Sequence, residues 1–210
     1  MIDTAALLAT LRRAPVVPVL IVEKLEHAVP LGTALVNGGL PALEVTLRTP
    51  VALDVVRAMA DIPGGVVGAG TILDPAQARE AVAAGAKFLV SPGATPAILD
   101  AALELGVPLL PGVATASEAM AARERGFKVL KFFPAGPAGG PTYLKALASP
   151  LGDVVFCPTG GVSPENARDY LKLPNVVCVG GSWVAPADAV AAGDWARVEA
   201  LAREAAAIRG

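Results

Sequence analysis

The sequence predicts an α/β fold, a single-domain (β/α)8 barrel in which eight parallel strands alternate with helices. Short apolar runs alternate with alanine-rich helical stretches along the whole chain, and the runs start 20 to 27 residues apart. Each interval has room for a strand, a turn and a helix of two or three turns. No linker interrupts the pattern, so residues 1–210 are expected to form one TIM barrel domain.

Eight apolar runs are the predicted strands. The mean hydropathy is +0.57 and 54% of the residues are apolar, which fits parallel strands that are covered on both faces. In chain order the runs are Val16–Val22, Leu43–Leu47, Val66–Ile72, Lys87–Ser91, Val107–Leu110, Val129–Phe133, Val154–Cys157 and Val176–Val179.

Helices are predicted between these strands, because several stretches begin with a capping residue followed by proline and end in glycine. The clearest are Pro75–Ala84, Pro96–Leu105, Ser117–Arg125 and Pro164–Leu171. Amphipathic helices are also expected around Thr4–Arg13, as an N-terminal capping helix, and around Trp195–Ile208.

An open, doubly wound sheet is the alternative fold for such an alternation of strands and helices. Sheets of that kind that bind dinucleotides carry Gly-x-Gly-x-x-Gly after the first strand, and this motif is absent there. Gly68-Ala69-Gly70 is a weak match that falls late within a predicted strand. The barrel is therefore preferred.

Composition excludes several classes of partner. The net charge is −2, the pI is near 5.5, and there is neither a basic run nor an abundance of aromatic residues for nucleic-acid binding. No window approaches the roughly 18 uncharged apolar residues of a membrane span. The first residues, MIDTAALLATLRR, lack the features of a signal peptide. We therefore expect a cytoplasmic protein with no nucleic-acid or membrane partner.

The single histidine and the two cysteines predict neither a metal site nor a cofactor. Cys157 and Cys178 each lie in an apolar run and are expected to be reduced core residues. His27 lies in a helix-like stretch and is expected to be structural. One histidine supplies too few ligands for a histidine-rich metal site, and a Ser-His-Asp triad is not expected.

Lys131 is the lone charged residue in the apolar run Val129–Phe133. Burying an ammonium group is costly, and burial lowers the pKa of a lysine in general. A neutral lysine amine attacks carbonyl groups and forms a Schiff base. Taken alone, Lys131 equally fits a lysine that extends to solvent or pairs with a buried carboxylate.

Glu44 is predicted to face Lys131 across the barrel. In the second predicted strand Leu43, Val45 and Leu47 alternate with Glu44, Thr46 and Arg48, so the polar set points into the lumen. Strands two and six of eight lie opposite each other, and barrel enzymes carry their chemistry at the C-terminal mouth. A purely structural ion pair is the alternative, but it leaves the concentration of polar groups in the lumen unexplained.

Glycine turns after the seventh and eighth strands predict a phosphate site. Thr159-Gly160-Gly161 precedes a predicted helix, and Gly180-Gly181-Ser182 follows the next strand. Glycine lets backbone N–H groups approach an anion closely, and a helix N-terminus adds its dipole. Arg48, helped by Thr71, is expected to hold a carboxylate. A 2-keto acid with a distal phosphate fits all these features.

The chain resembles the family of 2-keto-3-deoxy-6-phosphogluconate aldolase, a class I aldolase of the Entner–Doudoroff route. The resemblance covers nearly the whole chain and is carried by the segments VVPVLIVEKLEHAVP, LEVTLRT, VGAGT, SPG, PLLPGVAT, LKFFPA, FCPTGG and GGSW. It implies a metal-free (β/α)8 barrel that assembles as a homotrimer and acts on a phosphorylated 2-keto sugar acid.

The resemblance also implies roles for single residues. Lys131 takes the role of the Schiff-base lysine and Glu44 that of the general acid and base. Three residues are expected near the pyruvate part of the substrate: Arg48, Thr71 and Pro92. The phosphate-binding positions fall on Gly160, Gly161, Gly181 and Ser182. The glycine- and proline-rich loop after LKFFPA borders the site, which leaves the sugar preference open.

Three other functions stay open at this point. Cleavage of 4-hydroxy-2-oxoglutarate or of the galactonate epimer would use the same core chemistry. A phosphosugar isomerase or synthase could use Glu44 without an imine. A phosphosugar-binding barrel would keep the glycine turns without requiring Lys131.

Overall fold

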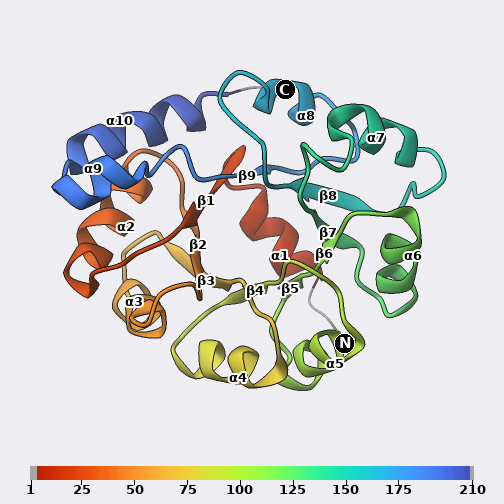
Figure 1. Cartoon of the computed structure of the whole chain (residues 1–210), viewed down its shortest axis with the longest axis horizontal. Helices are drawn as coiled ribbons and strands as arrows, with labels where there is room; N and C mark the ends of the chain where they lie inside the picture. The colour runs from red at the N-terminus through yellow and green to blue at the C-terminus, as the bar shows by residue number, and fades with distance from the viewer. Residues whose placement is uncertain (1–3, 209–210) are drawn as a thin grey trace.

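The computed structural model describes residues 4–208, so residues 1–3 and 209–210 of the predicted domain lie outside the described residues. Strands lie in a ring, most of the helices lie outside it, and α1 crosses its middle (Figure 1). The strands are β1 (Val16–Leu20), β2 (Ala42–Thr46), β3 (Val66–Gly70), β4 (Phe88–Val90), β5 (Leu109–Leu110), β6 (Gly112–Val113), β7 (Val129–Phe132), β8 (Val155–Pro158) and β9 (Val179–Gly181).

The strands form two parallel sheets, with the orders β5-β4-β3-β2-β1-β9 and β6-β7-β8. Isolated parallel bridges, Phe156 with Val176 and Thr159 with Gly180, join the two sheets on one side. On the other side Pro111, which separates β5 from β6, accepts a hydrogen bond from the Lys131 N–H at 2.9 Å. The predicted parallel α/β architecture is thus confirmed.

The helices follow the strands as the sequence predicts. They are α1 (Thr4–Leu11), α2 (Ala28–Asn37), α3 (Ala52–Met59), α4 (Pro75–Ala83), α5 (Pro96–Leu105), α6 (Ala116–Glu124), α7 (Gly140–Leu147), α8 (Ala167–Leu171), α9 (Ala187–Ala192) and α10 (Trp195–Ala206), with a 3-10 turn η1 (Leu25–His27) before α2. Asp74 and Thr95 cap α4 and α5 through their side chains, with proline in the first turn.

Several predicted boundaries are wrong. The fifth strand begins at Leu109 rather than Val107, and the eighth predicted strand, Val176–Val179, is observed at Val179–Gly181. A further short strand, β6, follows β5 after Pro111, because proline has no N–H to donate to a neighbouring strand. The third strand ends at Gly70 rather than Ile72, since Thr71 adopts a left-handed conformation with φ of 60°. The helix expected from Pro164 begins only at Ala167, after a turn.

The core has two parts. One apolar cluster includes strand residues such as Leu43 and Leu130 and helix residues such as Val55. The other, the inner cluster, joins Leu7 and Leu11 of α1, the helix that crosses the ring in Figure 1, to Cys178 and to the strand residues Val17, Ala42, Phe88, Val90, Leu110, Val129 and Cys157. Contacts between α1 and the strands are therefore apolar.

Leu11→Ala is expected to lower the free energy of unfolding by about 2–5 kcal/mol, because it leaves a cavity in the inner cluster. Leu11 is only 1% exposed, whereas Leu73, the matched control, is 57% exposed. Leu73→Ala should change the free energy by less than about 0.5 kcal/mol. Urea unfolding measures both, and equal effects of the two substitutions would contradict the burial argument.

Candidate active site

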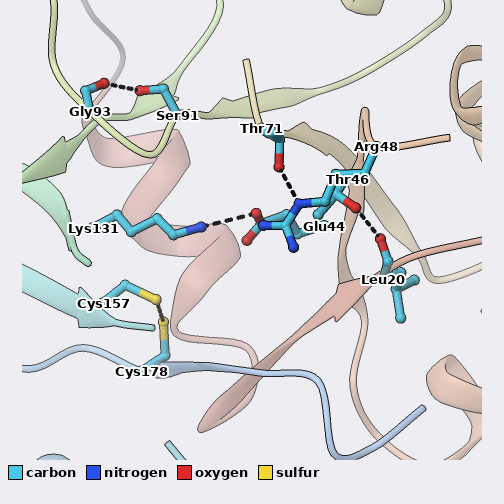
Figure 2. Close-up of polar contacts among 10 residues, drawn as sticks. All are labelled: Leu20, Glu44, Thr46, Arg48, Thr71, Ser91, Gly93, Lys131, Cys157 and Cys178. Atoms are coloured by element: carbon cyan, nitrogen blue, oxygen red, sulfur yellow. Dashed lines mark hydrogen bonds and ion pairs between the residues drawn. The ribbon is translucent and has the colours of Figure 1, made fainter. Parts of the chain in front are cut away.

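Glu44 and Lys131 form an ion pair inside the ring of strands. Glu44 lies in the middle of β2 and Lys131 in β7, and Lys131 Nζ is 3.1 Å from Glu44 Oε1. Their side chains are only 3% and 4% exposed, respectively. Figure 2 shows the lysine side chain extending toward the carboxylate. The sequence-based prediction that the two groups face each other is confirmed.

This pair has the chemistry of a proton-transfer couple. Both charges are removed from water, so each depends on the other for stabilisation. A carboxylate at hydrogen-bond distance can take the ammonium proton and leave a free amine, which is a nucleophile toward carbonyl carbon. The arrangement can therefore form an imine with a carbonyl ligand and shuttle protons to and from it.

Gly70 makes room for the Glu44 carboxylate. Gly70 is the last residue of β3 and pairs with Thr46 of β2. A Cβ built on Gly70 would lie 2.6 Å from Glu44 Cγ and still closer to Glu44 Oε1. Any larger residue at this position must displace Glu44, and the bond to Lys131 would then be lost.

Arg48 and Thr71, which follow β2 and β3, contact each other, as a joint role in binding requires. Arg48 Nε donates to Thr71 Oγ1 at 3.0 Å (Figure 2). Arg48 is exposed, so its remaining N–H groups are accessible to a ligand carboxylate. Thr71 has a φ of 60°, which is strained for a β-branched residue. This conformation accompanies the contact between its hydroxyl group and Arg48.

Pro92 lies in the loop after β4. The loop is held by a 2.7 Å hydrogen bond from Ser91 Oγ to the Gly93 carbonyl, and Pro92 is partly exposed. A Cβ on Gly112 of β6 would clash with the Pro92 carbonyl oxygen. Pro92 therefore packs tightly against β6, whose residue Gly112 pairs with Lys131.

The predicted phosphate turns adjoin each other. They follow two strand segments that are bridged at Thr159 and Gly180. Gly160 and Gly161 have φ values of 89° and 78°, which favour glycine. Gly181 ends β9, and Ser182 after it is exposed. The prediction that a helix N-terminus adds its dipole to the phosphate site is wrong, because α8 has only five residues and begins at Ala167, after the turn.

Two further side chains at the site were not predicted. The Thr159 hydroxyl oxygen is buried and has no hydrogen-bond partner within residues 4–208, which leaves it available to a ligand. The Phe133 ring centroid is 5.4 Å from Lys131 Nζ. Strand alternation could have identified Phe133, since it lies two residues after Lys131. No sequence signal marks the Thr159 hydroxyl as unpaired.

A pocket of about 600 Å³ opens next to this site rather than over the ion pair. Its walls include Ile21 after β1, Trp183 after β9 and Val190 of α9. Ser182 also lines it, whereas Lys131 and Glu44 do not. We place the chemistry at the ion pair rather than in this pocket, because reactivity depends on the polar groups and the pocket wall is mainly apolar.

The cysteines and the histidine lie as expected. Cys157 and Cys178 are buried free thiols 3.5 Å apart, and the hydrogen bond between them, with burial, raises the pKa of Cys178. His27 packs edge-on against Trp195 with 5.4 Å between ring centroids. Within the described part of the chain, no three histidine, cysteine, aspartate or glutamate residues are grouped to hold a metal ion. No helix among residues 4–208 is long and apolar enough to cross a membrane.

Comparisons with known proteins identify the family of the chain. Residues 7–201 match the family model described as "Aldolase: KDPG and KHG aldolase". The chain is 55% identical over 196 residues to the KHG/KDPG aldolase of Escherichia coli, covering 93% of this chain and 92% of the relative.

Two solved structures are also similar. One is the 2-keto-3-deoxy-6-phosphogluconate aldolase of Zymomonas mobilis with 3-phosphoglycerate, with TM-score 0.91, 47% identity and coverage of 96% of this chain and 95% of that chain. The other is the KDPG aldolase of Legionella pneumophila, with pyruvate captured as a covalent carbinolamine. Its TM-score is 0.93 at 44% identity, and the match covers 95% of this chain and 98% of that chain.

Gly70→Ala is expected to lower the free energy of unfolding by about 1–3 kcal/mol, because the added methyl group overpacks the space beside Glu44. Gly93→Ala is the matched control, since a Cβ there meets nothing within 4 Å. Thermal unfolding compares the two variants, and a crystal structure of Gly70→Ala should show Glu44 displaced from Lys131. An unmoved carboxylate would contradict the steric argument.

Proposed function

Because the chain belongs to the family of KDPG and KHG aldolases, we propose that Lys131 forms the Schiff base of its reaction and that Glu44 transfers the protons. The protein is a class I aldolase, a lyase that cleaves 2-keto-3-deoxy-6-phosphogluconate (KDPG) to pyruvate and glyceraldehyde 3-phosphate. The observation that carries the proposed residue roles is the buried 3.1 Å contact between Lys131 Nζ and Glu44 Oε1.

Imine formation begins with transfer of the Lys131 ammonium proton to Glu44. The free amine then attacks the C2 ketone of the substrate and forms a carbinolamine. Glu44 returns a proton to the carbinolamine hydroxyl, which leaves as water, and a protonated imine remains. Burial of the pair excludes bulk water from this step and strengthens the interaction of the charges.

Carbon–carbon cleavage follows from the protonated imine. Glu44, through a water molecule, removes the proton of the C4 hydroxyl group. The C3–C4 bond breaks, its electron pair moves into the imine, and glyceraldehyde 3-phosphate leaves. The remaining enamine takes a proton at C3 from Glu44, and hydrolysis of the imine releases pyruvate and restores Lys131.

The other proposed residues bind the two ends of the substrate. Arg48, with Thr71 as its hydrogen-bond partner at 3.0 Å, binds the C1 carboxylate. Pro92 lies against the pyruvate portion. The backbone N–H groups at Gly160, Gly161 and Gly181, with the Ser182 hydroxyl, bind the distal phosphate. The adjacency of the two turns supports this assignment.

A second substrate, 4-hydroxy-2-oxoglutarate, fits the same chemistry. The relative from Escherichia coli is named KHG/KDPG aldolase, and the imine and proton transfers act on the carbons that both substrates share. The isomerase and binding-barrel alternatives do not hold, because the family is one of aldolases.

Closure of the barrel and the position of α1 are also part of the proposal. We infer that the two sheets complete a closed (β/α)8 barrel in one domain, supported by the bridges between β8 and β9, and that α1 caps its N-terminal end. The homotrimer and the cytoplasmic location follow from the resemblance and from the sequence, and they stay predictions.

Lys131→Arg should abolish cleavage, because a guanidinium group keeps the charge but is not a nucleophile at neutral pH. Incubation with pyruvate and borohydride, followed by mass spectrometry, should give a permanent adduct at Lys131 in the unmodified protein and none in the variant. Lys128→Arg is the matched control, since Lys128 is exposed and pairs with Asp153. Turnover by a folded Lys131→Arg protein would contradict the imine assignment.

Glu44→Gln should reduce kcat by roughly 10²–10⁴-fold, because the amide cannot accept and return the protons of both half-reactions. Steady-state cleavage of KDPG measures the loss. Hydrogen exchange at the methyl group of pyruvate should fall in parallel, since the enamine is protonated by the same carboxylate. Exchange at the normal rate in this variant would assign the proton to another group.

A further inference from the structure

We propose that Asn166 is a positioning residue that holds the Gly160–Ser163 turn in the shape that binds the substrate phosphate. The inference rests on the proposed phosphate site and adds a residue that does not itself touch the substrate. The Asn166 side chain lies just before α8, and both of its hydrogen bonds join it to the turn.

Asn166 makes two hydrogen bonds across the turn. Its Nδ2 donates to the Gly161 carbonyl at 2.9 Å, and its Oδ1 accepts from the Ser163 backbone N–H at 2.8 Å. Asn166 is the N-cap residue of α8, yet its side chain makes no capping hydrogen bond to that helix. An asparagine at this position ordinarily accepts from an N–H within the first turn of the helix. Here the side chain is committed to the glycine turn instead.

These hydrogen bonds matter because the two glycine residues of the turn have few conformational restrictions of their own. Gly160 and Gly161 both have positive φ, and glycine loses more conformational freedom on ordering than any other residue. On the side of the β7–α7 loop, Gly136 donates its N–H to the Gly160 carbonyl at 2.8 Å. The Asn166 amide constrains the other side, at Gly161 and Ser163. A phosphate that binds the ordered turn avoids the entropy cost of ordering it.

The neutral amide also suits a turn that receives an anion. Glu165, the neighbouring carboxylate, already accepts a 2.5 Å hydrogen bond from Ser163 Oγ, which lowers the pKa of Glu165. An aspartate at position 166 could still accept from the Ser163 N–H but could not donate to Gly161. It would also place a second negative charge beside the phosphate.

Asn166→Ala is expected to raise the KM for KDPG about tenfold with kcat within twofold of the original, since lost hydrogen bonds of ordinary strength correspond to changes of this order. Asn166→Asp should raise the KM at least as much. Pyruvate has no phosphate group, so its binding should not depend on the turn. The pyruvate concentration that gives half-maximal borohydride trapping at Lys131 should therefore stay within twofold of that of the unmodified protein in both variants.

Asn175→Ala is the matched control, because Asn175 Nδ2 also binds a backbone carbonyl, that of Leu144, at 2.8 Å but away from the turn. It should lower the melting temperature and leave unchanged the ratio of the KM for KDPG to the pyruvate concentration for half-maximal trapping. The proposal is overturned if the KM for KDPG does not rise in Asn166→Ala, or if it rises together with that pyruvate concentration. Failure of the unmodified protein to trap pyruvate would instead refute the proposed role of Lys131.

Discussion

A single ion pair in the lumen, Lys131 with Glu44, constrains the rest of the molecule. The two residues are 87 positions apart in the chain, and their contact requires β2 and β7 to face each other across the ring. Two charges can lie this deep only if each neutralises the other, so a small displacement of either leaves a buried charge unpaired. Gly70 leaves space for the Glu44 carboxylate. Ala42 and Val129, two residues before Glu44 and Lys131 on the same strands, belong to the inner cluster and keep water from that side of the pair.

The polar side chains and the glycine turns of the site follow different strands of the ring. Arg48 and Thr71 lie on one side of the ion pair, after β2 and β3, while the glycine turns follow β8 and β9. A ligand with a carboxylate at one end and a phosphate at the other can therefore engage both sides with its ketone near Lys131. Binding energy from the distant phosphate can then help to orient the reacting carbons.

Strand alternation was sufficient to predict the most consequential contact. Polar residues that alternate with apolar ones in a strand covered by helices must face the lumen, and this alone predicts that Glu44 and Lys131 face each other. The conformation of Thr71 and the orphaned hydroxyl of Thr159 could not be predicted, because both depend on neighbours that only the folded chain supplies. The start of α8 was misjudged for a related reason: Ser163-Pro164 is a good helix signal locally, but Asn166 binds the preceding turn instead.

In the proposed mechanism, charge balance explains why a second cation, Arg48, accompanies the ion pair. Lys131 neutralises Glu44 at 3.1 Å, and a substrate carboxylate at Arg48 would neutralise the guanidinium group. Proton transfer from Lys131 to Glu44 then leaves the sum of the four charges at zero. The protonated imine restores the positive charge as Glu44 becomes a carboxylate again, and cleavage neutralises both at once. These four groups thus carry no net charge at any step of the proposed reaction, which suits multistep proton transfer in a low-dielectric site.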